Sequence, residues 1–126
     1  MIKLKDYFTG GSFHKVYLTS SIYELTETIG APQCHENNGS DKVNVEWNCV
    51  TDCGINFYIY DWKYYRSLGE DEEVDFHIGG KNFMETNTAL EKLLEMIKVT
   101  RAFDGKLDED EVEALNELKD IYTNED

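Results

Sequence analysis

The stretch KVNVEWNCVTDCGINFYIYDWK, residues 42–63, decides the fold together with EVDFHIGG at residues 73–80. Apolar and polar residues alternate in both segments, which is typical of strands with one buried face. We therefore expect three antiparallel strands at 42–51, 55–62 and 74–78. Their inward positions are apolar: Val43, Val45, Trp47, Cys49, Ile55, Phe57, Ile59, Val74, Phe76 and Ile78.

The opposite positions combine aromatic and polar side chains. So many aromatic residues are unusual for a surface that binds nothing. These positions are Asn44, Glu46, Asn48, Tyr58, Tyr60, Trp62, Asp75 and His77. The register of the first hairpin places Cys49 opposite Phe57, because a slip of one residue would turn one apolar face to water. Gly54 supplies the positive φ that such a short loop needs.

The N-terminal third predicts an arm, a strand and a short helix. Gly10-Gly11 makes residues 1–12 a flexible arm, and residues 14–19 alternate as a strand. Ser21 and Glu24 have the spacing of a capping box, and Gly30 ends the helix that they begin.

Two further helices are expected after the sheet. One begins at Thr86 or Asn87, with the apolar positions Ala89, Leu90, Leu93, Leu94 and Ile97 at helical spacing. The other begins near Asp108. The sequence thus predicts one α+β domain over residues 1–126. It has an antiparallel sheet of about four strands, a short N-terminal helix and two C-terminal helices packed on one face.

Twelve basic and 26 acidic residues give a net charge of −14. Direct binding of nucleic acid is disfavoured, because neutralising phosphates takes Lys and Arg. A basic partner or mimicry of nucleic acid is favoured, and solubility alone is the plainer explanation. Acidic clusters lie at 70–73 and 108–111.

The cellular setting follows from what the sequence lacks. The N-terminus has no apolar signal-peptide core, and no apolar run reaches membrane-spanning length. Three cysteines, an odd number, favour reduced thiols. We expect a cytoplasmic protein without a cofactor.

Two segments of the sequence partly match the ligand spacing of metal sites. The segment 104–111 matches the second half of a calcium loop, but Thr100 and Ala102 occupy the first and third ligand positions, so a capped helical hairpin explains it better. Cys34, His35, Cys49 and Cys53 lack the spacing of a zinc site. We expect no metal.

His77 and Asp75 share a strand face, so His77 could act as a general base in a hydrolase. A hydrogen-bonded surface histidine is the simpler interpretation, and no enzyme is predicted.

The segment Gly79-Gly80-Lys81-Asn82 precedes a helix and is the clearest ligand candidate. Paired glycines let backbone N–H groups approach a ligand, and a helix N-terminus favours anions. Tyr58, Tyr60 and Phe83 could stack a base beside it. A simple strand-to-helix turn is the alternative.

The residues Ile59-Tyr60-Asp61-Trp62-Lys63 and Phe76-His77-Ile78-Gly79-Gly80 resemble a pattern of small bacteriophage-encoded proteins, over roughly residues 16–97. The size and layout are similar to phage anti-Thoeris sponges, which bind cyclic ADP-ribose signals without cleaving them. The resemblance implies a cytoplasmic counter-defence protein. Ligands of that class usually engage arginines, and this chain has Arg66 and Arg101, neither of which matches a motif.

Three hypotheses result. The first is a non-enzymatic sponge for a nucleotide immune signal of the cyclic ADP-ribose or cyclic oligonucleotide class. The second is an acidic nucleic-acid mimic that inhibits a host defence protein, of the anti-CRISPR or anti-restriction type, and the third is the hydrolase. The expected ligand-binding residues are Tyr58, Tyr60, Arg66, His77, Gly79, Gly80, Lys81, Asn82, Phe83 and Arg101. The aromatic face and the amphipathic terminal helices also favour a homodimer or higher homo-oligomer.

Overall fold

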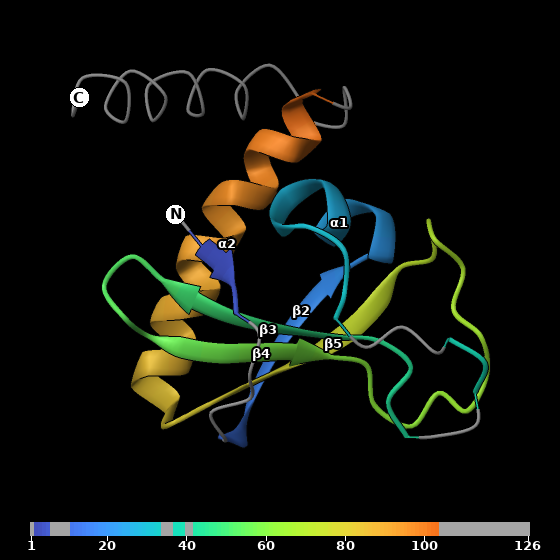
Figure 1. Ribbon diagram of the computed structural model, residues 1–126, viewed down its shortest axis with the longest axis horizontal. Coiled ribbons are helices and arrows are strands. Elements are labelled where there is room, and N and C mark those ends of the chain that lie inside the picture. Colours follow the sequence, from blue (N-terminus) through green and yellow to red (C-terminus); the bar gives the residue numbers. More distant parts are fainter. Residues whose placement is uncertain (1, 6–10, 34–36, 40–41, 104–126) are drawn as a thin grey trace.

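The computed structural model describes residues 2–5, 11–33, 37–39 and 42–103. Within them, five strands form one antiparallel sheet in the order β1-β3-β4-β5-β2. The strands are β1 (Ile2–Leu4), β2 (Ser12–Ser20), β3 (Glu46–Thr51), β4 (Asn56–Tyr60) and β5 (Val74–Gly80), and the helices are α1 (Ile22–Ile29) and α2 (Phe83–Phe103). Figure 1 shows the long helix α2 crossing the sheet, with α1 beside its C-terminal half. The predicted α+β class is confirmed, with one strand more than expected.

The β3–β4 hairpin has the predicted register. Cys49 lies opposite Phe57, and Gly54 in the connecting loop has a φ of 86°. The first strand is shorter than expected, because it begins at Glu46 rather than at residue 42. The reason lies in the backbone N–H groups of Asn44 and Val45, which donate to the side chain of Asp61 instead of to a neighbouring strand.

The inward face of the sheet forms the core with both helices. Trp47 and Phe76 meet edge to face with ring centroids 5.7 Å apart, and neither is exposed. The Trp47 indole N–H donates to the Gly30 carbonyl at 2.9 Å, so the largest core ring also fixes the end of α1. The fully buried apolar residues include Leu25, Trp47, Cys49, Ile59, Phe76, Ile78, Ala89, Leu93 and Ile97.

The expectation of a loose N-terminal arm is wrong for residues 2–4. Ile2 pairs with Thr51 and Leu4 with Cys49, which places β1 at the edge of the sheet beside β3. Ile2 is buried against the core. Burial of alternate apolar side chains orders this strand, and three residues are too few for the pattern to be recognised.

Strand β2 contains a bulge that the alternation of its residues does not reveal. Val16 lies opposite Ile78, but Phe13 lies opposite Gly79, so His14 and Lys15 have no partners in the ladder. Lys15 adopts a φ of 62°, which is uncommon for a residue other than glycine. Without the bulge, Phe13 would lie opposite residue 81. The bulge shifts its partner by two positions, to Gly79.

Helix α1 begins and ends as predicted. Ser21 is the N-cap and accepts a hydrogen bond from the Glu24 N–H, and the Gly30 N–H donates to the Thr26 carbonyl at the other end. Glu24 is buried and accepts two hydrogen bonds from Arg101 of α2, at 3.0 and 3.1 Å. An ion pair with a buried carboxylate and a partly exposed arginine therefore joins the two helices.

The predicted start of α2 at Thr86 or Asn87 is wrong. The helix begins at Phe83, because the Asn82 side chain caps it by accepting from the Glu85 N–H at 2.8 Å. Asn82 and Glu85 also exchange a side-chain hydrogen bond, as in a capping box. Of the five expected apolar positions, Ala89, Leu93 and Ile97 are buried and Leu90 is partly buried, whereas Leu94 is exposed.

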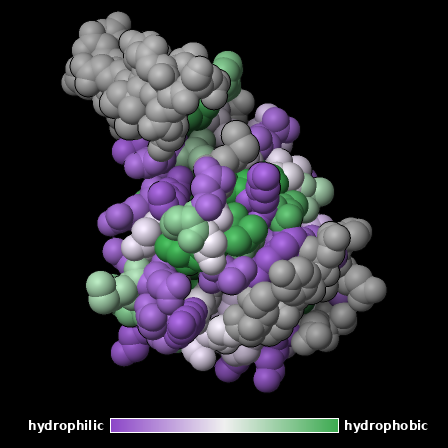
Figure 2. Space-filling view, turned by 60° about the vertical axis from the view of Figure 1, so that its left-hand side comes forward, coloured by the Kyte–Doolittle hydropathy of each residue, from purple (hydrophilic) through white to green (hydrophobic). Residues whose placement is uncertain are grey.

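On the side that carries the β3–β4 turn and α2, apolar side chains occupy limited areas bordered by hydrophilic ones (Figure 2). Exposed apolar residues of α2 include Phe83, Met84, Leu94 and Phe103. The expected helix after Asp108 and the acidic loop at 104–111 lie outside the described residues.

Candidate aromatic binding face

The outward face of the sheet carries a continuous cluster of rings around His77. The cluster is called the aromatic face and consists of Phe13, Tyr17, Tyr58, Tyr60, Trp62 and His77. Phe13 stacks on His77 with centroids 4.2 Å apart, and the Tyr17 and Tyr60 rings meet His77 edge-on at 5.2 and 5.4 Å. Trp62 lies 6.2 Å from His77, so four rings contact one imidazole.

Strand register explains why these rings meet. His77 in the middle of β5 lies directly opposite Tyr60 on one side and Tyr17 on the other. Directly opposed residues of antiparallel strands bring their side chains together on one face. The β2 bulge adds Phe13 to this group, because it places Phe13 opposite Gly79 and next to His77.

Part of the aromatic face is open to solvent. Tyr17 is 52% exposed and Trp62 is 39% exposed, while Tyr60 lies within the ring cluster at 8%. Tyr58 stacks on Tyr60 with centroids 4.9 Å apart, and its hydroxyl donates to the Gly11 carbonyl. The sequence identified Tyr58, Tyr60 and His77 as site residues, and the structure brings these three together.

The two glycines of the predicted site allow neighbouring side chains to pack closely against β5. Gly79 and Gly80 lie within β5, pair with both neighbouring strands and are buried. A Cβ at Gly79 would lie 2.2 Å from the Tyr58 ring, and one at Gly80 would lie 2.3 Å from the Thr86 hydroxyl. Gly79 thus lets the Tyr58 ring lie over β5, and Gly80 lets α2 start close to the strand.

The remaining residues of the predicted turn follow the end of β5. Lys81 is exposed, Asn82 is occupied as the cap of α2, and Phe83 is 56% exposed as the first helical residue. No described ring contact joins Phe83 to the aromatic face. The arrangement matches the alternative interpretation, a strand-to-helix turn.

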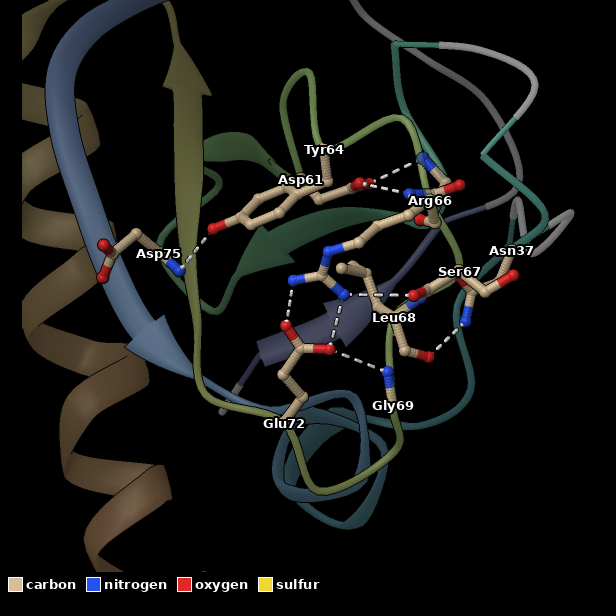
Figure 3. A network of polar contacts seen from close by, with 10 residues as sticks. Asn37, Asp61, Tyr64, Arg66, Ser67, Leu68, Gly69, Glu72 and Asp75 are labelled. Carbon is tan, nitrogen blue, oxygen red and sulfur yellow. Dashed lines mark hydrogen bonds and ion pairs between the residues drawn. The ribbon is translucent and has the colours of Figure 1, made fainter.

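Both arginines of the predicted site are held in ion pairs. Arg101 binds Glu24 between the helices, on the core side of the sheet. Arg66 donates through two nitrogens to the Glu72 carboxylate, with the guanidinium between that carboxylate and the Tyr64 ring (Figure 3). The hydrogen bonds from Arg66 lower the pKa of Glu72 to about 2. Neither arginine joins the aromatic face.

A second polar network holds the loop that presents Trp62. The buried carboxylate of Asp61 accepts hydrogen bonds from the Asn44 backbone, the Asn44 amide and the Val45 backbone, at 2.7 to 2.9 Å. Asn37 binds the same loop at Leu68: its side-chain amide donates to the Leu68 carbonyl and accepts from the Leu68 N–H (Figure 3). Asp61 directly precedes Trp62, so this network fixes the point from which the indole projects.

Sequence reasoning missed five contributors to the site. Lys42 and Lys63 place their ammonium groups 5.9 and 5.6 Å from the Trp62 ring centroid. Trp62 was assigned to the outward face by its alternation but was not included among the site residues, and Phe13 depends on a bulge. The alternation of β2 was the available signal for Tyr17, a further ring that was left out.

Burial shifts the titration of the groups on this face. Desolvation lowers the pKa of His77 and raises that of Glu46, the residue opposite Tyr60. Desolvation, with the neighbouring Tyr58, also raises the pKa of Tyr60 to about 12. Each shift favours the uncharged form, so His77 and both tyrosines present neutral rings at pH 7.

Other groups considered from sequence are Asp75 and the cysteines, of which Cys34, with its neighbour His35, lies outside the described residues. Asp75 accepts a hydrogen bond from Thr19, and no described contact joins a carboxylate to His77 as a base-orienting partner. Cys49 is buried with a pKa raised to about 12 by desolvation, while Cys53 is exposed on the hairpin loop. Across the described ranges, no group of three metal-ligating side chains is found.

No protein-family model matches this chain, and a search of curated proteins gives no match either. Of the helices in the described part of the chain, none has the length and apolar character needed to cross a membrane.

Proposed function

We propose that this protein acts by binding without turnover, and that the aromatic face is its binding surface. The observation that carries the proposal is the group of four rings around His77, with Tyr17 and Trp62 both more than one-third exposed. Large rings that remain accessible on a rigid sheet offer contact area at low entropic cost. A histidine surrounded by rings, without a described carboxylate partner, favours binding over general-base catalysis.

The ligand class that we propose is a nucleotide immune signal of the cyclic ADP-ribose or cyclic oligonucleotide class. Aromatic side chains on a sheet stack nucleobases, and a stacked base contributes about 1–3 kcal/mol. The resemblance to phage counter-defence proteins supports a sponge that sequesters such a signal. The net charge of −14 opposes it at long range, so the contacts on the face must supply the affinity.

Thermal unfolding in the presence of cyclic ADP-ribose or cyclic di-GMP tests this function. A sponge gains stability with rising ligand concentration, because the ligand binds only the folded state. Chromatography of the released ligand should return it intact. Tyr17→Ala should abolish the gain, whereas Tyr65→Ala, which truncates a tyrosine of 56% exposure that has no described ring contact with the face, should preserve it. Absence of any shift with either compound contradicts the proposal.

A second candidate is the acidic inhibitor of a host defence protein. Glu70, Asp71 and Glu73 are exposed in the loop before β5, and carboxylate arrays can occupy a basic groove. This function predicts binding to a DNA-dependent defence nuclease that weakens steeply with salt and competes with DNA. Neutralising the three residues together should remove that binding and leave any nucleotide-induced stabilisation unchanged.

A further inference from the structure

Two lysines lie beside Trp62, an exposed ring at one end of the aromatic face. The Lys42 and Lys63 ammonium groups lie 5.9 and 5.6 Å from the Trp62 ring centroid, and both side chains are exposed. The Lys63 backbone N–H donates to the Lys42 carbonyl at 2.8 Å, which holds the two residues side by side although they are 21 positions apart in sequence.

The loop that carries Lys63 adopts an unfavourable backbone conformation. Lys63 and Tyr65 have φ values of 61° and 51°, in the left-handed region that residues other than glycine seldom adopt. Such conformations cost about 1–3 kcal/mol each and persist only where surrounding contacts impose them. The loop is held at its start by the hydrogen bonds from Asn44 and Val45 to Asp61, and further on by the Asn44 amide, which donates to the Arg66 carbonyl at 2.9 Å.

Among the described residues, Asp61, Glu46 and Asp75 are engaged in hydrogen bonds or partly buried. Asp61 is fully buried and directs its carboxylate to backbone and amide donors. Glu46 is opposite Tyr60 and is partly buried, and Asp75 accepts a hydrogen bond from Thr19. At this end of the aromatic face, the two ammonium groups and the indole bring positive charge and a planar ring together.

We propose that Lys42, Trp62 and Lys63 form the phosphate end of the nucleotide site, with the phosphate at the two lysines and the base directed along the rings towards His77. This inference rests on the proposed function and assigns the orientation of the ligand. It moves the phosphate away from the Gly79-Gly80-Lys81 turn, where both glycines are buried in β5. Lysine binds phosphate as a point charge, and stacking on the neighbouring rings tolerates any base.

Tryptophan fluorescence provides a direct measurement. Trp62 is 39% exposed and Trp47 is fully buried, so quenching on ligand addition reports on Trp62. Cyclic ADP-ribose should quench the emission, and adenosine, which lacks phosphate, should bind at least about tenfold more weakly. A Trp62→Phe variant should lose the quenching while calorimetry still detects cyclic ADP-ribose.

The lysine variants separate the inference from the proposed function. The K42Q/K63Q double variant should weaken cyclic ADP-ribose binding at least about tenfold and leave adenosine binding unchanged. K81Q, which neutralises an exposed lysine at the turn, should bind like the parent chain. Full affinity in K42Q/K63Q, or a loss in K81Q instead, overturns the phosphate assignment while the function stands. If calorimetry detects neither cyclic ADP-ribose nor cyclic di-GMP with the parent chain, both proposals fail.

Discussion

On the inner face of the sheet Trp47 meets Phe76 with no exposed surface, whereas on the outer face Trp62 meets His77 and remains 39% exposed. Both faces gather aromatic rings on the same strands. The inner rings interlock with two helices and a sheet, so their removal leaves a cavity. The outer rings contact one another across one layer and keep accessible surface. Aromatic content alone therefore does not separate the core from the exposed face of the sheet, but the number of layers around each ring does.

The two tryptophans test this comparison with the largest expected effect. Trp47→Ala should lower the free energy of unfolding by about 3–5 kcal/mol, because it opens a cavity and removes the hydrogen bond to the Gly30 carbonyl. Trp62→Ala should cost about 1 kcal/mol or less, since part of that ring is already in water. Urea unfolding measures both. Equal losses would show that the outer cluster belongs to the core.

The buried carboxylate of Asp61 gives the next largest effect. Asp61→Ala should cost roughly 3 kcal/mol, because it leaves the Asn44 and Val45 donors without an acceptor. Asp71→Ala, in the exposed part of the same connection between β4 and β5, is the matched control and should change stability by less than about 0.5 kcal/mol. A mild effect of Asp61→Ala would mean that water replaces the carboxylate.

Gly79→Ala tests how the sheet accommodates the Tyr58 ring. The new methyl would lie 2.2 Å from that ring, so the substitution should cost about 1–3 kcal/mol. In a Tyr58→Ala background the same substitution should be nearly neutral, which gives a coupling of about 1 kcal/mol or more in a double-mutant cycle. Additive losses would indicate that Gly79 is needed for its backbone and not for the ring above it.

The smallest expected effect is a pH dependence that distinguishes the outer face. Burial lowers the pKa of His77 from its usual 6.5, so the unfolded chain binds a proton more readily than the folded one. Stability is then complete above pH 6.5 and declines as the pH falls through the lower folded pKa. His77→Phe should decline less between pH 7 and pH 5 in urea unfolding. Identical profiles for both proteins would contradict the desolvation of His77.

Alternation along the strands was enough to predict the fold class and the hairpin register. The pairing of Cys49 with Phe57 and the outward position of His77 both follow from the need to bury one apolar face. The cap at Ser21 was equally local, because it depends on a spacing of three residues. Features determined by neighbours in sequence, or by the need to bury one face, could therefore be predicted from the sequence.

The site was harder to predict because its determinants are distant in sequence. The bulge that brings Phe13 onto His77, and the hydrogen bond that brings Lys63 to Lys42, join segments that no local pattern relates. Gly79 resembled a ligand loop, and only the position of the Tyr58 ring reveals its packing role. The Asn82 cap was local and could have been predicted from the glutamate three residues later.

The β2 bulge at His14 and Lys15 also affects whether copies of this chain can associate through the sheet edge. Strand β2 is the last strand of the described sheet, and an outermost strand offers unpaired peptide groups to any passing chain. The bulge interrupts the row of unpaired peptide groups and leaves five residues, Val16 to Ser20, in regular pairing with β5. A template so short supports little further strand addition, so the protein can display aromatic rings next to a sheet edge and still resist self-association into fibrils.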